Sequence, residues 1–193
     1  MKRPWLLLSA LLQYPDAALL EAVQELGPLA VGDRRLERFL AWLDETPLRD
    51  VEEGYVRSFD FDRRASLHLT YHTHGDRRQR GLELVRLKRR FAEAGLPLTA
   101  SELPDYLPVL LEFAALAPPA GETLLNELRA PLELVRSRLH DTGSPYANLL
   151  DSLVGSLPRP TKAQLAAARR LAGEGPPSEL VGLEPASEPA ATA

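Results

Sequence analysis

Apolar residues recur along most of this chain at the three- and four-residue spacing that places them on one face of an α-helix. The most regular stripe consists of Tyr146, Leu149, Leu150, Leu153, Val154 and Leu157. A shorter stripe of the same kind consists of Leu36, Phe39, Leu40 and Leu43. Runs of β-branched residues, which are typical of strands, are almost absent. The pattern therefore predicts an all-α protein.

The opening apolar stretch, which starts at Trp5, is predicted to be the first helix. The basic pair Lys2-Arg3 before it gives the region some likeness to a secretory signal. However, the apolar run is short, and Tyr14-Pro15 stops it in the way that a helix end does. No stretch reaches the roughly 18 apolar residues of a membrane span, so no stable membrane insertion is expected.

Prolines and glycines set the expected helix boundaries farther along. Thr46-Pro47 is predicted to be an N-cap followed by the first residue of a helix. A long helix is expected from 76 to 94, with Gly95 as its terminator. The apolar residues expected to face inward from this helix are Leu82, Val85 and Phe91. Before the next helix, Asp105 is predicted to be the N-cap.

A chain of 193 residues is of ordinary size for one domain with its own core. We expect a single all-helical domain over 1–172. The segment 173–193 is rich in Pro, Gly, Glu, Ser and Ala, and is expected to be a flexible tail.

Composition narrows the function classes. The chain has no cysteine, which excludes a disulfide framework, a thiolate nucleophile and cysteine-ligated metal centres. Its formal net charge of −4 gives no general attraction to nucleic acid. The basic stretch between Arg77 and Arg90 is therefore interpreted as a solvated helix face, with nucleic-acid binding as an alternative. Signature motifs of phosphate loops, nucleophile elbows and zinc proteases are absent. The chain is expected not to be an enzyme.

Three of the four histidines lie close together, at His68, His72 and His74. Histidines four residues apart on a helix can bind one metal ion. A metal-dependent helical enzyme that uses His68, His72 and a carboxylate, either Asp62 or Asp76, is therefore the alternative hypothesis. The leading expectation is that the chain holds no metal and no cofactor of its own.

Two central segments carry a resemblance. The first contains His-x-His-Gly-Asp-x-Arg-x-Arg-Gly at 72–81, and the second contains Glu-Leu-Pro-Asp-x-Leu-Pro at 102–108. Both resemble the NarJ family, which comprises the molybdenum-cofactor assembly chaperones of respiratory nitrate reductase. The likeness extends over most of 5–157. Tyr106 departs from the pattern, because some relatives have His there.

The resemblance implies a TorD-like, single-domain helical bundle of the molybdoenzyme-chaperone type. It implies a cytoplasmic chaperone whose partner is the apo catalytic (alpha) subunit of nitrate reductase, chiefly the N-terminal segment of that subunit. The chaperone would assist insertion of the molybdenum cofactor before membrane assembly. Transient contact with the molybdenum cofactor or its delivery proteins is left open.

A peptide-binding groove needs apolar walls and a polar rim. The residues that we predict as walls are Leu67, Tyr71, Leu107, Leu110 and Leu111. The residues carried over from the two strings as a rim are His72, His74, Asp76, Arg80, Glu102, Asp105 and Glu112. Each could instead have a structural role, as a cap, an ion pair or part of the core.

Overall fold

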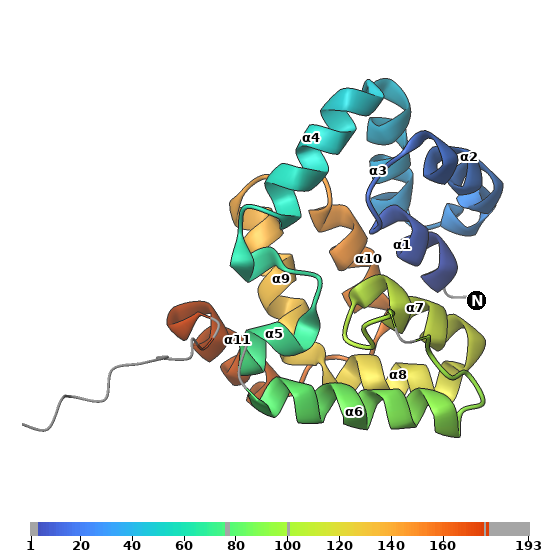
Figure 1. The fold of residues 1–193 in the computed structure, drawn as a ribbon. Helices are drawn as coiled ribbons and strands as arrows, with labels where there is room; N and C mark the ends of the chain where they lie inside the picture. Colours follow the sequence, from blue (N-terminus) through green and yellow to red (C-terminus); the bar gives the residue numbers. More distant parts are fainter. Residues whose placement is uncertain (1–3, 76–77, 100, 176, 178–193) are drawn as a thin grey trace, which may run out of the picture.

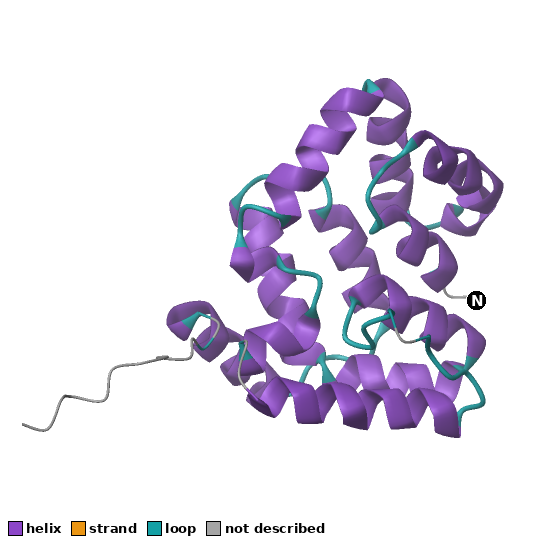
Figure 2. Cartoon of the chain, viewed as in Figure 1, coloured by secondary structure: helices purple, strands orange, loops and turns teal. Residues whose placement is uncertain are grey.

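The computed structural model describes residues 4–75, 78–99, 101–175 and 177. Over these residues the chain forms α-helices joined by short loops and contains no strand, so the predicted all-α class is confirmed (Figure 2). The first half contains α1 (Trp5–Leu11), α2 (Ala17–Leu26), η1 (Gly27–Ala30), α3 (Arg34–Glu45), α4 (Leu48–Phe59), η2 (Arg63–Ala65) and α5 (Leu69–His74). The second half contains α6 (Arg78–Glu93), α7 (Leu107–Leu116), α8 (Pro118–Glu127), α9 (Arg129–Asp141), α10 (Ala147–Ser156) and α11 (Lys162–Glu174).

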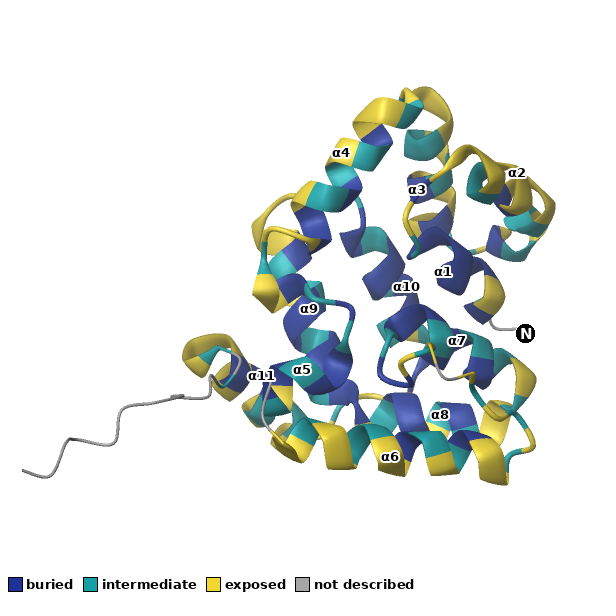
Figure 3. Ribbon diagram, in the orientation of Figure 1, coloured by how far each residue is buried: buried dark blue, intermediate teal, exposed yellow. Residues whose placement is uncertain are grey.

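The helices pack around α9 and α10, which lie in the middle of the molecule (Figure 1). Helix α1 packs on α7, α10 on α3 and α9, and α11 on α9. Helix α6 runs along one edge beside α8 (Figure 1). The predicted stripe on α10 is core, because Leu149, Leu150 and Leu153 are fully buried; most of α10 has the dark blue of buried residues in Figure 3. Tyr146 joins Phe39, Tyr55 and Phe59 in an aromatic cluster with ring centroids 5.1 to 5.7 Å from Tyr146.

The first helix of the sequence prediction is α1, and it belongs to the core. Trp5, Leu7, Leu8 and Leu11 are all buried. None of the described helices is both long enough and apolar enough to cross a bilayer. The helical domain was expected to end at 172, and its last helix, α11, continues to Glu174, two residues past that boundary. Most of the predicted tail lies outside the described residues.

The local predictions for the start of α4 and for the inward face of α6 are wrong. Thr46 does not cap α4, because its hydroxyl donates back to the carbonyl of Trp42, 2.5 Å away, and so closes α3. Pro47 has an extended ψ of 139° and stands before the helix rather than in it. In α6, Leu82 and Val85 are 67% and 52% exposed, whereas Leu87 and Phe91 are buried. The face of α6 that packs inward therefore contains Leu87 and Phe91, and Leu82 and Val85 lie on the solvent side.

Two glycines are required by the local geometry. Gly95 follows α6 with φ of +78°, the left-handed conformation predicted for a helix terminator. Gly121 lies where α8 crosses α7 closely, and a Cβ atom there would approach the Cα of Ala114 to 2.2 Å. Only a residue without a side chain allows this contact.

Candidate functional site

The two segments that carry the family resemblance meet in space. Their backbones form an isolated antiparallel bridge between His68 and Tyr106. The amide of Leu69 donates to the carbonyl of Asp105, and the amide of Leu107 donates to the carbonyl of Leu67, both over 2.9 Å. The His68 and Tyr106 rings also lie against each other, with centroids 5.1 Å apart. We call this region the motif junction, and it makes one structural unit of strings that are distant in sequence.

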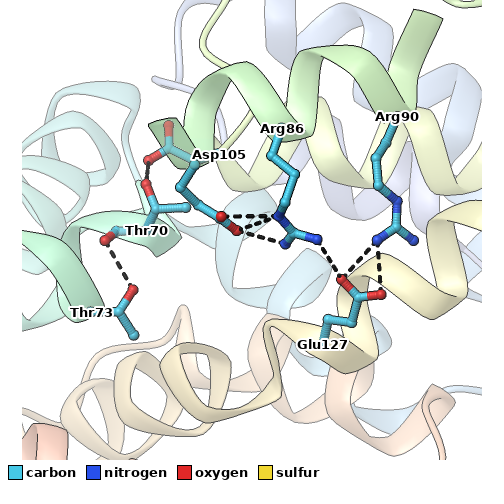
Figure 4. Close-up of polar contacts among 7 residues, drawn as sticks. Thr70, Thr73, Arg86, Arg90, Asp105 and Glu127 are labelled. Carbon is cyan, nitrogen blue, oxygen red and sulfur yellow. Dashed lines mark hydrogen bonds and ion pairs between the residues drawn. The ribbon is translucent and has the colours of Figure 1, made fainter. Parts of the chain in front are cut away.

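The carboxylate of Asp105 is the centre of the motif junction. It is fully buried and accepts hydrogen bonds from Thr70 Oγ1 at 2.5 Å and Arg80 Nη2 at 3.0 Å. His68 Nδ1 lies 3.3 Å from its other oxygen. Figure 4 shows the chain of contacts from Asp105 through Thr70 to Thr73 on α5. The carboxylate therefore ties the loop before α7 to α5 and α6.

These partners also determine the ionisation of Asp105. Burial by itself raises the pKa of a carboxyl, but the hydrogen bonds from His68 and Thr70 and the positive charge of Arg80 outweigh it. The pKa of Asp105 consequently lies below its ordinary value. The prediction that Asp105 caps the following helix is wrong. Tyr106 holds the N-cap position of α7, and the Asp105 side chain turns into the core instead.

His72 is fully buried beside the motif junction. Its Nε2 lies 2.8 Å from the carbonyl oxygen of Ser66, so this nitrogen carries the proton and donates. Its Nδ1 has no hydrogen-bond partner among the described residues. Burial lowers the pKa of His72, which favours the neutral imidazole.

The metal hypothesis finds its proposed ligands otherwise engaged. His68 faces Asp105, and Asp62 pairs with Arg138 and accepts from the amide of Arg64. Within the described part of the chain, no group of three or more His, Asp or Glu side chains gathers as a metal site would require. Asp76 lies outside the described residues.

The other predicted site residues are distributed over three environments. Leu67, Leu107, Leu110 and Leu111 are buried in the core, so their side chains present no accessible wall. Glu102 accepts from the amide and hydroxyl of Thr99, and Glu112 accepts from the hydroxyl of Ser9 on α1. His74 is partly exposed in the last turn of α5.

Tyr71 and Arg80 are the predicted residues that border an accessible hollow. It has a volume of about 380 Å³ and lies between the end of α4, η2 and α5. The guanidinium groups of Arg80 and Arg63 lie 5.9 and 6.0 Å from the centroid of the Tyr71 ring, a cation–π arrangement on both. This hollow is small, and two cations border it.

The basic stretch of α6 is partly neutralised by its neighbour. Arg86 and Arg90 both reach Glu127 at the end of α8, at 3.5 and 2.8 Å (Figure 4). Arg86 also pairs with Glu83, one turn earlier on α6. These contacts fit a helix face that packs through ion pairs better than one that binds a nucleic-acid backbone.

A larger apolar groove lies between α2 and α3, which the sequence interpretation did not single out. Its volume is about 550 Å³, and its apolar lining includes Leu20, Val23, Leu40 and Leu43. Exposed carboxylates stand on the same two helices, namely Glu21, Glu25, Asp44 and Glu45. Helix α2 contains no basic residue. We call this feature the α2–α3 groove, and it combines accessible apolar walls with an acidic surround.

The comparison with known families decides the classification. The model of the family described as nitrate reductase delta subunit matches residues 17–151, a range that contains both halves of the motif junction. The chain belongs to this family. The resemblance that was recognised in the two strings is confirmed.

Several relatives within this family carry descriptive names. The probable nitrate reductase molybdenum cofactor assembly chaperone NarJ of Bacillus subtilis is 36% identical over 158 residues, which is 78% of this chain and 85% of the relative. NarJ of Escherichia coli K12 is 35% identical over 157 residues, which is 77% of this chain and 66% of the relative. The nitrate reductase-like protein NarX of Mycobacterium tuberculosis is 36% identical over 150 residues, but the match covers only 22% of that much longer protein.

Proposed function

We propose that this protein is a chaperone of nitrate reductase assembly. In this proposal it binds the N-terminal segment of the immature catalytic subunit in the cytoplasm and assists insertion of the molybdenum cofactor before the enzyme reaches the membrane. The observation that carries the proposal is the similarity, over more than three quarters of the chain, to proteins named as molybdenum cofactor assembly chaperones. No catalytic step is assigned to the chain.

The α2–α3 groove is the surface that best suits a client segment. An amphipathic helix binds a groove by burying its apolar face, and its polar face meets the rim. Here half-buried Leu20, Leu40 and Leu43 supply the apolar contact, and Asp44 lies in the lining itself. The carboxylates around the groove would attract a segment whose polar face is basic, or the free amino group at its start.

The motif junction has a supporting role in this proposal. Its hydrogen bonds join the loop before α7 to α5 and α6, and α7 in turn packs on α1, which carries α2. It therefore stabilises the framework on which the groove is built. We still predict that other parts of the client contact the partly exposed residues Tyr71, His74 and Arg80.

The experiment that tests cofactor assistance is a comparison of the catalytic subunit produced with and without this protein. The proposal predicts that the subunit made with the chaperone contains molybdenum and that the subunit made without it contains much less. Equal molybdenum content in both preparations, measured by elemental analysis at matched subunit yield, would exclude the proposed role.

A further inference from the structure

Another hollow lies away from both the motif junction and the α2–α3 groove. Its volume is about 870 Å³, and it opens between the first turns of α3 and the length of α10, next to Pro4. Arginines dominate its charged lining, which contains Arg34, Arg35, Arg38, Asp33 and Asp151. We call it the arginine hollow.

Arg38 lies three residues after Arg35 and four after Arg34, so it is a neighbour of each on the surface of α3, and all three line the hollow. Side chains of all three are exposed, and none forms an ion pair with another described residue. The neighbouring Glu37 is not part of the lining and forms no ion pair with the three arginines among the described residues; its carboxylate accepts from the amide of Gly32.

The two carboxylates of the lining are already committed to other partners. Asp33 accepts from the amide of Arg35 at 2.9 Å and from the hydroxyl of Ser152 at 2.6 Å. Asp151 pairs with Arg136 at 2.5 Å and with His140 at 3.0 Å. Asp33 keeps its negative charge, because its two donors are neutral, whereas Asp151 is paired with groups outside the lining. Three arginines against the one remaining carboxylate charge leave the lining with a positive surplus, although the whole chain has a net charge of −4.

This charge arrangement is unfavourable for the helix that carries it. Cations in the first turn of a helix oppose its dipole, and like charges four residues apart repel each other. Helix α3 has two arginines in its first turn and a third one turn later, while its last turn holds Asp44 and Glu45. Local helix stability thus gives no reason for the cluster, which is typical of residues that serve a function.

A glycine on α10 makes room for one of the three. A Cβ atom at Gly155 would lie 2.8 Å from Nη1 of Arg35, so the bare backbone lets that guanidinium rest across α10. Beside the arginines, the hollow also has an apolar part formed by Leu29 and Val31.

We propose that the arginine hollow binds an organic phosphate, with a diphosphate group on the three arginines and an uncharged moiety against Leu29 and Val31. Guanidinium groups bind phosphate oxygens in pairs and are preferred for this task. A volume of about 870 Å³ falls in the range of roughly 300 to 1,000 Å³ that small-molecule sites occupy. Its concave shape favours such a ligand over an acidic protein surface.

The test is calorimetric titration of the full chain with inorganic pyrophosphate and with ADP, at constant ionic strength set by NaCl. Binding of both, with ADP the tighter, is the expected result and indicates that the organic part contributes. The double variant Arg35→Gln/Arg38→Gln is expected to weaken binding by about tenfold or more. Arg89→Gln, an exposed arginine on α6, is the matched control and should bind as the wild type does.

Gly155→Ala separates binding from folding. Alanine favours a helix interior, so this variant should unfold at the same or a higher temperature, yet it displaces Arg35 and should weaken pyrophosphate binding. No binding of either ligand by the wild type would overturn the proposal, as would equal affinity of the double variant. Binding of a poly-glutamate peptide without binding of either phosphate would also overturn it and would assign the hollow to an acidic partner.

Discussion

The guanidinium of Arg80 lies 3.0 Å from the buried carboxylate of Asp105, across 25 residues of sequence. Asp105 is fully buried, and the Arg80 side chain is only 19% exposed. Arg80 belongs to the first string of the family pattern and Asp105 to the second. The ion pair, together with Thr70 and the backbone bridge, explains why both strings are needed for one structure.

Removing one partner of this pair should be costly. Asp105→Ala leaves Arg80, Thr70 and His68 without their acceptor, and we expect the free energy of unfolding to fall by about 3 kcal/mol. Urea denaturation measures the change. Glu53→Gln, which breaks the exposed pair with Arg49 on α4, is the control and should change stability by less than about 1 kcal/mol. Similar small effects for both variants would show that the motif junction does not hold the fold.

Stability should depend on pH in two windows. The folded state lowers the pKa of His72, so the unfolded chain binds a proton more readily, and stability is lost as the pH falls below about 6.5. The folded state also lowers the pKa of Asp105, whose contribution is complete above about pH 4 and is lost as the pH falls below that value.

Chemical denaturation between pH 7 and pH 5 isolates the first window. His72→Gln is expected to be less stable than the wild type at pH 7, and the difference should narrow toward pH 5 because Gln cannot take up the proton. A difference that stays constant, or that grows as the pH falls, would contradict the assignment of a neutral buried imidazole.

The same substitution should have opposite effects at two glycines, because Gly121 lies at the contact between α7 and α8 and Gly54 does not. Gly121→Ala places a Cβ atom against the backbone of Ala114 and should destabilise the protein by about 2 kcal/mol, although alanine is the better helix former. Gly54→Ala on α4 meets nothing within 4 Å and should stabilise by about 0.5 to 1 kcal/mol. Thermal unfolding of both variants checks the pair. If Gly121→Ala stabilises the protein, α7 and α8 are farther apart than the structure shows.

The orientation of α6 can be tested with its own leucines. Leu87→Ala should cost about 2 to 5 kcal/mol because Leu87 is fully buried. Leu82→Ala removes a side chain that is 67% exposed and should change stability by less than about 0.5 kcal/mol. If urea denaturation shows a larger loss of stability for Leu82→Ala than for Leu87→Ala, α6 has the orientation that the sequence pattern predicted.

The sequence predicted what depends on local periodicity. The stripe on α10 was confirmed because its apolar residues lie on one face, and the first helix was confirmed because nearly all of its residues are apolar and buried. Helix α6 was misoriented because it has apolar residues on two faces, and Leu82-Val85 has the same spacing as Leu84-Leu87. Only packing against the rest of the molecule distinguishes these faces.

The candidate site was less accessible to prediction, because its determinants are long-range. Asp105 precedes a helix, as a capping residue does, and no local signal shows that Thr70 and Arg80 lie in contact with it. Leu107, Leu110 and Leu111 have the spacing of a groove wall and of a core alike. The α2–α3 groove depends on how far two helices stand apart, and its leucines form ordinary stripes in sequence. The two strings identified the family, but they did not identify the accessible surface.

The measurement that tests the account most directly is calorimetric titration of this protein with the N-terminal peptide of its nitrate reductase catalytic subunit. A peptide of about 20 residues is long enough for roughly five helical turns across the groove. We expect the wild type to bind it, and Leu20→Ser/Asp44→Lys to bind at least about tenfold more weakly. The control Leu82→Ser/Glu93→Lys, which makes the same changes on α6, should keep the wild-type affinity. If both double variants lose the same amount of peptide affinity, or if neither loses any, the groove is not the binding surface. If the wild-type chain does not bind the peptide, the proposed recognition of this client segment is wrong.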